Sequence, residues 1–192
     1  VLWSTGFIFS RIVAAHAEPL TFLTVRFGAA LVVIATIALA MRAPWPTPSA
    51  AGHAMVAGAL LHAGYLGPVF WAIAHGMSAG ISALIVSMQP ILTAFLAAWW
   101  LGEQIRPRHW LGLGLGVAGV AIVLWPRIAA GSADAQVDTV AAALLGLAGI
   151  TLGSIYQKRF GGGLDLRSAG AFQFLGCTAV VALGALVLED GR

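Results

Sequence analysis

The chain has 192 residues, of which 60% are hydrophobic and 9% are charged, and its mean hydropathy is +0.93. A soluble domain carries about 25% charged residues, so this composition excludes a water-soluble globular protein. The net charge of +3 does not indicate a nucleic-acid partner, because the ten Lys and Arg residues stand near the ends of apolar runs, as they do in membrane proteins.

Seven apolar segments, all rich in Ala, Leu, Val and Gly, follow one another along the chain. They cover residues 1–15, 19–41, 54–74, 78–101, 109–125, 139–157 and 168–188. Backbone groups must pair with one another inside a bilayer, so helices or closed barrels are the structures that can span it. The runs are continuous rather than alternating, which favours helices. The sequence therefore predicts an all-α, polytopic transmembrane helix bundle of the inner (plasma) membrane, surrounded by the lipid bilayer.

The first segment is short for a membrane span, which needs about 20 residues. It begins without Met and already inside an apolar run. We therefore expect the chain to be a fragment with a clipped N-terminus.

Basic residues predict the orientation of the bundle. Alternate linkers on one side hold Arg42, then Arg106 and Arg108, then Lys158, Arg159 and Arg167, whereas the other side holds Arg11, Arg127 and Arg192. Cytoplasmic loops carry an excess of Lys and Arg. The first set is the larger, so we expect it to be cytoplasmic, and the N-terminus with it.

A faint internal repeat runs through the chain at an offset of 147 residues. The offset places Gly6 on Gly153, Phe9 on Tyr156, Arg11 on Lys158, Glu18 on Asp165, Thr21 on Ser168 and Arg26 on Gln173. Five helices separate equivalent points, and an odd number makes the second copy inverted, a recurrent transporter design. Residues 1–130 would form a first five-helix repeat and residues 139–192 the first two helices of a second. About seven helices of ten would then be present.

Two short matches to enzyme motifs lack the structural context that those motifs need. Residues 76–80 fit G-x-S-x-G, but Ser78 starts an apolar helix rather than following a strand. Residues 114–119 fit the dinucleotide pattern G-x-G-x-x-G, but they lie inside an apolar helix. The five histidines show no metal-ligand spacing, and His62 is expected to serve as hydrogen-bonded packing. The sequence predicts no catalytic residue, metal or cofactor.

Other residues are expected to have structural roles. Gly112 and Gly116 form a small-xxx-small face on which a neighbouring helix can pack closely, and Gly149 with Gly153 forms a second. A further group lies at a membrane boundary, where an ion pair would fasten a cytoplasmic turn; it consists of Glu103, Arg106 and Arg108.

Arg26 is the most informative charge in the chain. It lies about a third of the way into the second segment, where a basic side chain costs roughly 2.5–3.5 kcal/mol on insertion scales. Two interpretations stay open. Arg26 pairs with the carboxylate or phosphate of a substrate inside the bundle, or it snorkels outward or binds helix carbonyls.

Gln89 and Pro90 form the second candidate site, near the middle of the fourth segment. Proline removes a backbone N–H and leaves a carbonyl without a donor, and many transporters build midplane sites from such broken helices. A simple kink is the alternative interpretation. Pro68, beside Tyr65 and Trp71 in the third segment, is a second candidate kink with the same ambiguity.

Residues 78–124 resemble the fourth and fifth helices of the EamA-like branch of the drug/metabolite transporter superfamily. The matching residues are Ser78, Ala79, Gly80, Pro90, Leu101, Gly102, Glu103, Trp110 and the glycines after it. The resemblance extends to the first two helices, through Trp3 to Arg11, Pro19 with Leu20, and Arg26 with Phe27. It implies ten helices in two inverted repeats, a cytoplasmic N-terminus, and export or exchange of small metabolites. Arg11 stands where that family often has Lys.

The resulting hypothesis is a transporter that works by alternating access on amino-acid-like or other amphipathic solutes. Its substrate cavity would be lined by Trp3, Ser4, Arg26, Tyr65, Trp71, Gln89, Tyr156 and Gln173. A non-transporting membrane scaffold is an alternative and would need no polar cavity. A small multidrug-resistance exporter is another, but it predicts about four helices and a buried Glu in the first. The sequence does not specify the substrate, the coupling ion or the oligomeric state.

Overall fold

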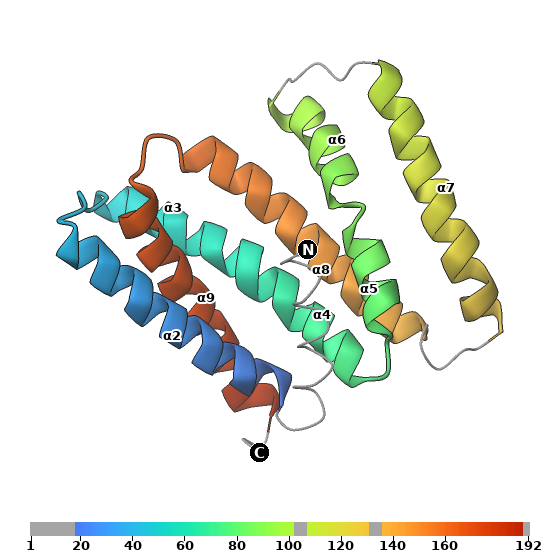
Figure 1. Ribbon diagram of the computed structural model, residues 1–192, viewed down its shortest axis with the longest axis horizontal. Helices are drawn as coiled ribbons and strands as arrows, with labels where there is room; N and C mark the ends of the chain where they lie inside the picture. The colour runs from blue at the N-terminus through green and yellow to red at the C-terminus, as the bar shows by residue number, and fades with distance from the viewer. Residues whose placement is uncertain (1–17, 102–106, 131–135, 190–192) are drawn as a thin grey trace.

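The computed structural model describes residues 18–101, 107–130 and 136–189, and in this part of the chain every regular element is a helix (Figure 1). The predicted all-α fold is confirmed, while the predicted segment 1–15 lies outside the described residues. The elements are α2 (Pro19–Ala40), α3 (Pro48–Gly58), the π-helix η1 (Ala59–Ala63), α4 (Gly64–Ala74), α5 (Ala79–Val86), α6 (Gln89–Leu101), α7 (Pro107–Ala129), α8 (Val137–Phe160) and α9 (Leu166–Leu188).

The helices join into membrane-length rods. Five stretches of the described residues are long and apolar enough to cross a membrane, with mean hydropathies from 1.4 to 2.2. They are Pro19–Ala40, Pro48–Ala74, Ala79–Trp100, Val137–Phe160 and Leu166–Leu188. We number these rods by the apolar segments of the sequence to which they correspond, so that Pro19–Ala40 is the second rod and Ala79–Trp100 the fourth. The third rod, Pro48–Ala74, which we call the third span, is α3, η1 and α4 in continuous succession. The protein is therefore a multi-pass membrane protein.

Two helix boundaries differ from the sequence prediction by four residues or more, because hydropathy marks the apolar stretch and not the helix end. The third span begins at Pro48 rather than at residue 54, since the Thr47 hydroxyl accepts a hydrogen bond from the Ala50 N–H at 3.4 Å and Pro48 needs no N–H partner at the first turn. α7 continues through Pro126 to Ala129 instead of ending at residue 125.

Helix α8 is the centre of the bundle. It contacts the third span on one side and α5 and α6 on the other, while α9 packs between α2 and α3, and α7 lies against α5 and α6 at one edge (Figure 1). Glycine makes the central contact possible: a Cβ at Gly149 would lie 2.6 Å from the carbonyl carbon of Gly64, and one at Gly153 would lie 2.8 Å from the Leu61 nitrogen. The absence of side chains lets the two backbones touch, as in other membrane helix pairs.

Of the two glycines predicted to form a packing face on α7, Gly116 packs against a neighbouring helix of the described part of the chain and Gly112 does not. A Cβ at Gly116 would lie 2.6 Å from the Ile91 Cδ1 atom of α6, whereas one at Gly112 would meet no atom of the described residues within 4 Å. Glu103 and Arg106 lie outside the described residues, and Arg108 is exposed in the first turn of α7.

Successive rods run in opposite directions, so the bundle has two ends of different charge (Figure 1). The basic end, as we call it, carries Arg42, Arg108, Lys158, Arg159 and Arg167 together with Asp165. The other end, which we call the acidic end, carries Glu18, Asp138 and Glu189 together with Arg127 in the last turn of α7. The described charges thus lie at the ends of the rods, apart from Arg26.

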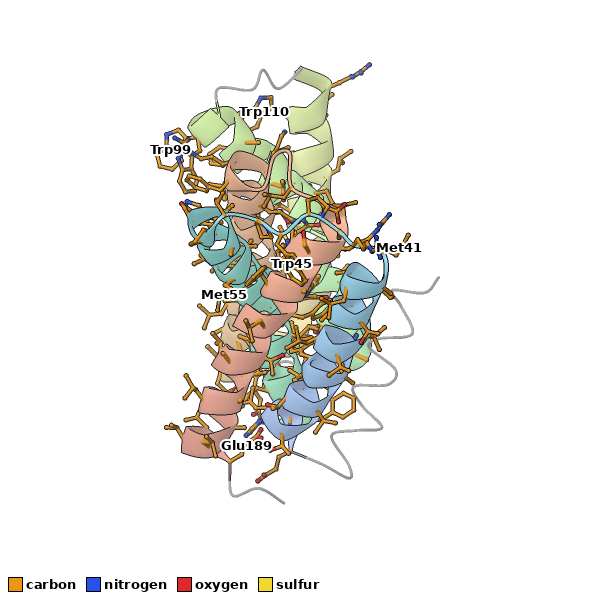
Figure 2. All side chains as sticks on the ribbon, turned by 90° about the vertical axis from the view of Figure 1, so that its left-hand side faces the viewer. Met41, Trp45, Met55, Trp99, Trp110 and Glu189 are labelled. Carbon is orange, nitrogen blue, oxygen red and sulfur yellow. The ribbon has the colours of Figure 1, made fainter. Side chains whose placement is uncertain are left out.

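The start of α2 is held by a carboxylate from the far end of the chain. Glu189, just after α9, accepts hydrogen bonds from the Leu20 and Thr21 N–H groups, both at 2.7 Å, and from the Thr21 hydroxyl at 2.9 Å (Figure 2). The α2 N-cap residue, Glu18, supplies no side-chain cap of its own. A negative charge at a helix N-terminus is favourable, so Glu189 both caps α2 and fastens it to α9.

Removing this cap should cost stability. Glu189→Ala is expected to lower the free energy of unfolding by about 1–3 kcal/mol, because hydrogen bonds to a charged group are lost and two N–H groups are left without an acceptor. Thr21→Val should cost less, and the double variant should lose little more than Glu189→Ala alone.

The matched control is Thr36→Val, whose exposed hydroxyl bonds to the Val32 carbonyl of its own helix. It should change stability by less than about 0.5 kcal/mol. Denaturant titration of the full-length protein in micelles measures all four variants. If the stability losses of Thr21→Val and Glu189→Ala simply added in the double variant, the hydrogen bond between the two side chains would be contradicted.

Candidate functional site

Six of the eight predicted cavity residues lie in the described part of the chain; Trp3 and Ser4 lie outside it. Five of the six fall into three polar groups. The first contains Arg26 and Tyr65, the second contains Gln89, and the third contains Tyr156 and Gln173. Trp71 belongs to none of them: it lies at the acidic end of α4, is 38% exposed, and stacks on His75 at 3.9 Å between ring centroids.

The first group lies where Arg26 and Phe27 of α2 face the third span, which carries His62 and the buried Tyr65. The His62 ring stacks on Phe174 of α9 at 5.1 Å and lies 5.9 Å from the ring of Phe27. Arg26 itself is exposed, and no carboxylate among the described residues pairs with it. Within the described ranges, therefore, no carboxylate neutralises this guanidinium.

Distortion of the third span accompanies this group. His62 lies in the π-helix η1, which closes with the Gly64 N–H donating to the Ala59 carbonyl five residues back. Pro68, one turn further, has no N–H to offer the Gly64 carbonyl. π-turns inside α-helices occur frequently at functional sites. The sequence singled out Pro68 but gave no sign of the π-turn.

The second group is the interruption of the fourth rod at Gln89 and Pro90. α5 ends at Val86 and α6 begins at Gln89, because Pro90 cannot donate to the Val86 carbonyl. The Gln89 side-chain amide donates to the Ser154 hydroxyl of α8 at 3.4 Å and to the Thr93 hydroxyl at 3.3 Å. A polar side chain at a broken helix therefore meets the central helix.

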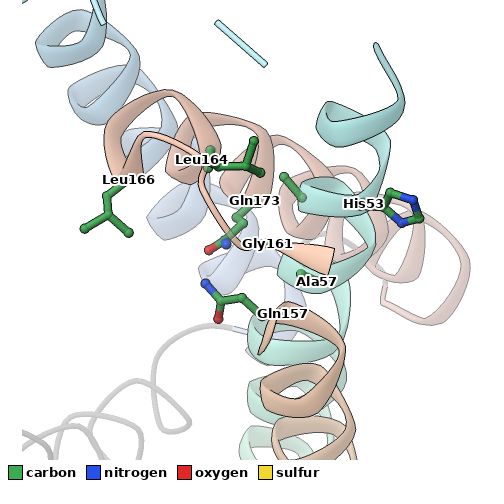
Figure 3. A pocket seen from close by; sticks show the side chains of 9 residues that line it. His53, Ala57, Gln157, Gly161, Leu164, Leu166 and Gln173 are labelled. Atoms are coloured by element: carbon green, nitrogen blue, oxygen red, sulfur yellow. The ribbon is translucent and has the colours of Figure 1, made fainter. Parts of the chain in front are cut away.

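The third group lies towards the basic end. The Tyr156 hydroxyl and the His53 Nδ1 atom are 2.7 Å apart and share a hydrogen bond. Close by is a cavity of about 70 Å³, into which the amides of Gln157 and Gln173 point from opposite sides (Figure 3). It has room for a few water molecules, but it is well below the roughly 300–1,000 Å³ of ordinary ligand pockets. Its lining is completed by His53, Ala54, Ala57, Gly161, Leu164, Leu166 and Ala169.

Enzyme and metal chemistry find no support in the described residues. The Ser78 hydroxyl accepts a hydrogen bond from the Ile81 N–H at 3.3 Å and so caps α5, which is a structural role. Residues 114–119 lie in the middle of α7. No group of three His, Cys, Asp or Glu side chains in the described ranges could hold a metal ion.

Several partners in these groups were not singled out as site residues from the sequence. His53 and Gln157 stand on separate helices, and nothing local marks them as neighbours of Tyr156 and Gln173. Ser154 directly follows Gly153, a position of the internal repeat, which is the local sequence signal for it.

The comparison with known families decides the identity. The model of the EamA-like transporter family matches residues 1–125, about two thirds of the chain, including the Gln89 interruption. The chain belongs to the EamA-like transporter family. This family consists of membrane transporters rather than enzymes.

Individual relatives agree with this assignment. The chain is similar to the uncharacterized transporter sll0355 of Synechocystis sp., with 30% identity over 65% of this chain and 38% of that protein. It is 28% identical to the uncharacterized transporter YvbV of Bacillus subtilis, over 86% of this chain and 53% of that protein. It is 24% identical to the uncharacterized inner membrane transporter YedA of Escherichia coli K12, over 99% of this chain and 60% of that protein.

A relative with a more specific name is the probable amino-acid metabolite efflux pump of Salmonella typhimurium, 27% identical over 65% of this chain and 40% of that protein. The chain thus spans between 38% and 60% of the length of these relatives. No solved structure matches the chain.

Proposed function

We propose that this EamA-like chain is part of a transporter that exports or exchanges amino-acid-like or other amphipathic solutes by alternating access. The observation that carries the proposal is Arg26, an intramembrane guanidinium with no carboxylate partner among the described residues and with His62 and Tyr65 near it. Such a charge is costly in a bilayer and marks a functional position. The efflux-pump name of the Salmonella relative supports an amino-acid-like solute.

The inverted repeat is part of this proposal. α2 begins at Pro19 and α9 at Leu166, and the difference, 166 − 19 = 147, equals the offset found in the sequence. The two helices pack against each other and run in opposite directions (Figure 1). Equivalent helices of an inverted repeat have this relation, which supports a first repeat in residues 1–130 and the start of a second in residues 139–192.

Two hydroxyls that the offset of 147 residues pairs, those of Thr21 and Ser168, also make similar hydrogen bonds. Thr21 donates to Glu189, just after α9, at 2.9 Å. Ser168, which the offset places on Thr21, donates to the Pro44 carbonyl, just after α2, at 2.7 Å. Each helix is therefore fastened near its first turn to the segment that follows its partner.

The charges of the two ends support a cytoplasmic basic end, and with it a cytoplasmic N-terminus. Five described Lys and Arg residues lie at the basic end, whereas Arg127 is the one described Lys or Arg at the acidic end. A phosphatase reporter inserted at residues 161–163 should be inactive, and one at residues 131–135 active. The reverse pattern would contradict this orientation.

Alternating access predicts that residue 89 meets water from each side of the membrane in turn. In a cysteine-free form of the full-length protein, Gln89→Cys should react with a membrane-impermeant maleimide added from either side, and solute should change the rate. The control is Leu145→Cys, which is 65% exposed on the apolar surface of α8 and should stay unlabelled in lipid. If Gln89→Cys reacted with maleimide as little as Leu145→Cys from both sides, the result would favour a non-transporting membrane scaffold.

A further inference from the structure

The basic end carries a side-chain cluster whose members are not among the predicted cavity residues. The Arg159 guanidinium, near the end of α8, lies 6.0 Å from the ring centroid of Trp100 in α6 and 5.7 Å from that of Phe160. Phe160 in turn stacks on His53 of α3, with centroids 4.6 Å apart and an interplanar angle of 5°. We call Trp100, Arg159 and Phe160 the Arg159 cluster. Helices α6 and α8 thus meet at one guanidinium, and α3 joins them through the Phe160 ring.

The hydrogen-bond donors of Arg159 are available to an outside ligand. Contact with aromatic rings is a cation–π interaction, which leaves N–H donors of the guanidinium free to bind an anion. Arg159 is exposed, and it makes no hydrogen bond or ion pair with another described residue. The aromatic contacts therefore hold the charge in place without neutralising it.

The surrounding charge is positive. Arg42, Arg108, Lys158 and Arg167 lie at the same end as Arg159. The described acidic residue of this end is Asp165, whose carboxylate accepts a hydrogen bond from the Arg167 N–H and caps α9. A potential of this sign favours an anionic ligand over a neutral one.

Exposed tryptophans indicate where that ligand comes from. Trp99 is 79% exposed, Trp100 46% and Trp110 49%, and Trp99 and Trp110 lie at the same end of the bundle (Figure 2). Tryptophan is enriched at the level of lipid headgroups, where its ring meets acyl chains and its N–H meets water. Apolar rings around a free guanidinium suit an anion that carries acyl chains better than a soluble one.

We propose that the Arg159 cluster binds the phosphodiester headgroup of an anionic phospholipid. The guanidinium pairs with the phosphate oxygens, and the acyl chains lie against the exposed tryptophans. Basic pockets between membrane helices recognise lipid headgroups through this chemistry. The site is separate from Arg26, which lies within the second rod and not at its end.

Native mass spectrometry of the full-length protein in micelles tests the site. Phosphatidylglycerol and phosphatidylcholine are titrated separately, and inorganic phosphate is added as a competitor. Phosphatidylglycerol should bind more tightly than phosphatidylcholine, and Arg159→Gln should weaken its binding roughly fivefold. Arg159→Lys should retain part of the affinity, and millimolar phosphate should not displace the lipid.

The matched control is Arg42→Gln, which removes the same charge from the same end, next to α2. It should change phosphatidylglycerol binding less than twofold. Equal losses in the two variants would show non-specific surface charge and overturn the proposal, as would equal affinity for the two lipids or displacement by phosphate. Should Arg159→Gln fail to fold, Trp100→Leu tests the same cluster and should weaken binding about twofold; unchanged binding there overturns it.

Discussion

Replacing Gly149 with alanine is expected to destabilise the bundle by about 1–3 kcal/mol or more, the usual cost of inserting atoms into a packed core. The new Cβ would lie 2.6 Å from the Gly64 carbonyl carbon and 3.1 Å from the Tyr65 nitrogen. Both are backbone atoms of the third span, so no side chain can rotate away. α8 must move instead, and because it contacts five other elements the strain spreads through the bundle.

The matched control for Gly149→Ala is Gly112→Ala in α7. A Cβ at Gly112 would meet no described atom within 4 Å, and alanine favours a helix over glycine. Stability should therefore be unchanged or slightly raised. Denaturant titration in micelles gives both values, and equal effects at the two positions would show that α8 does not pack on the third span as described.

Arg26→Ala is expected to have the largest effect on function, lowering the transport of solutes that carry a carboxylate at least tenfold. Truncating one member of a desolvated charge pair costs about 2–5 kcal/mol, which corresponds to more than tenfold in rate if it falls on the transition state. Arg26→Lys should keep part of the activity, since an ammonium supplies the charge without the planar pair of donors.

The stability of the Arg26→Ala variant distinguishes a substrate-binding role of Arg26 from a structural role. An intramembrane guanidinium costs roughly 2.5–3.5 kcal/mol on insertion scales, so Arg26→Ala should not destabilise the protein. Arg42→Ala, which removes an exposed charge at the basic end, is the control and should leave transport near the wild-type level. Wild-type transport in Arg26→Ala, or unfolding of that variant, would remove Arg26 from the site.

The sequence predicted the rods well because a bilayer demands a long apolar stretch for each one. α9 starts two residues before the predicted segment, and the fourth rod is interrupted beside Pro90, which the sequence singled out. The start of the third span was missed because capping by Thr47, rather than hydropathy, sets it. The π-turn at His62 was missed because it reflects the packing of that rod, which no local pattern encodes.

The sequence could predict which residues belong to the candidate site better than it could predict which of them lie together. Polar residues inside apolar runs are conspicuous, so Arg26 and Gln89 could be found one at a time. Their partners depend on how the rods are turned about their axes, and that follows from glycine contacts such as Gly149 with Gly64. Glu189 looked like an ordinary end-of-helix charge, and its bond to Thr21 joins residues 168 positions apart.

Solute flux through the full-length protein in proteoliposomes tests most directly whether this bundle is a transporter. Liposomes are loaded with an unlabelled amino acid and mixed with a trace of the labelled one, across neutral, acidic and basic side chains. A transporter predicts saturable, protein-dependent counterflow of at least one of them, which Arg26→Ala abolishes and Arg42→Ala does not. Folded wild-type protein that accumulates no more label than protein-free liposomes, for every solute in the panel, would contradict it.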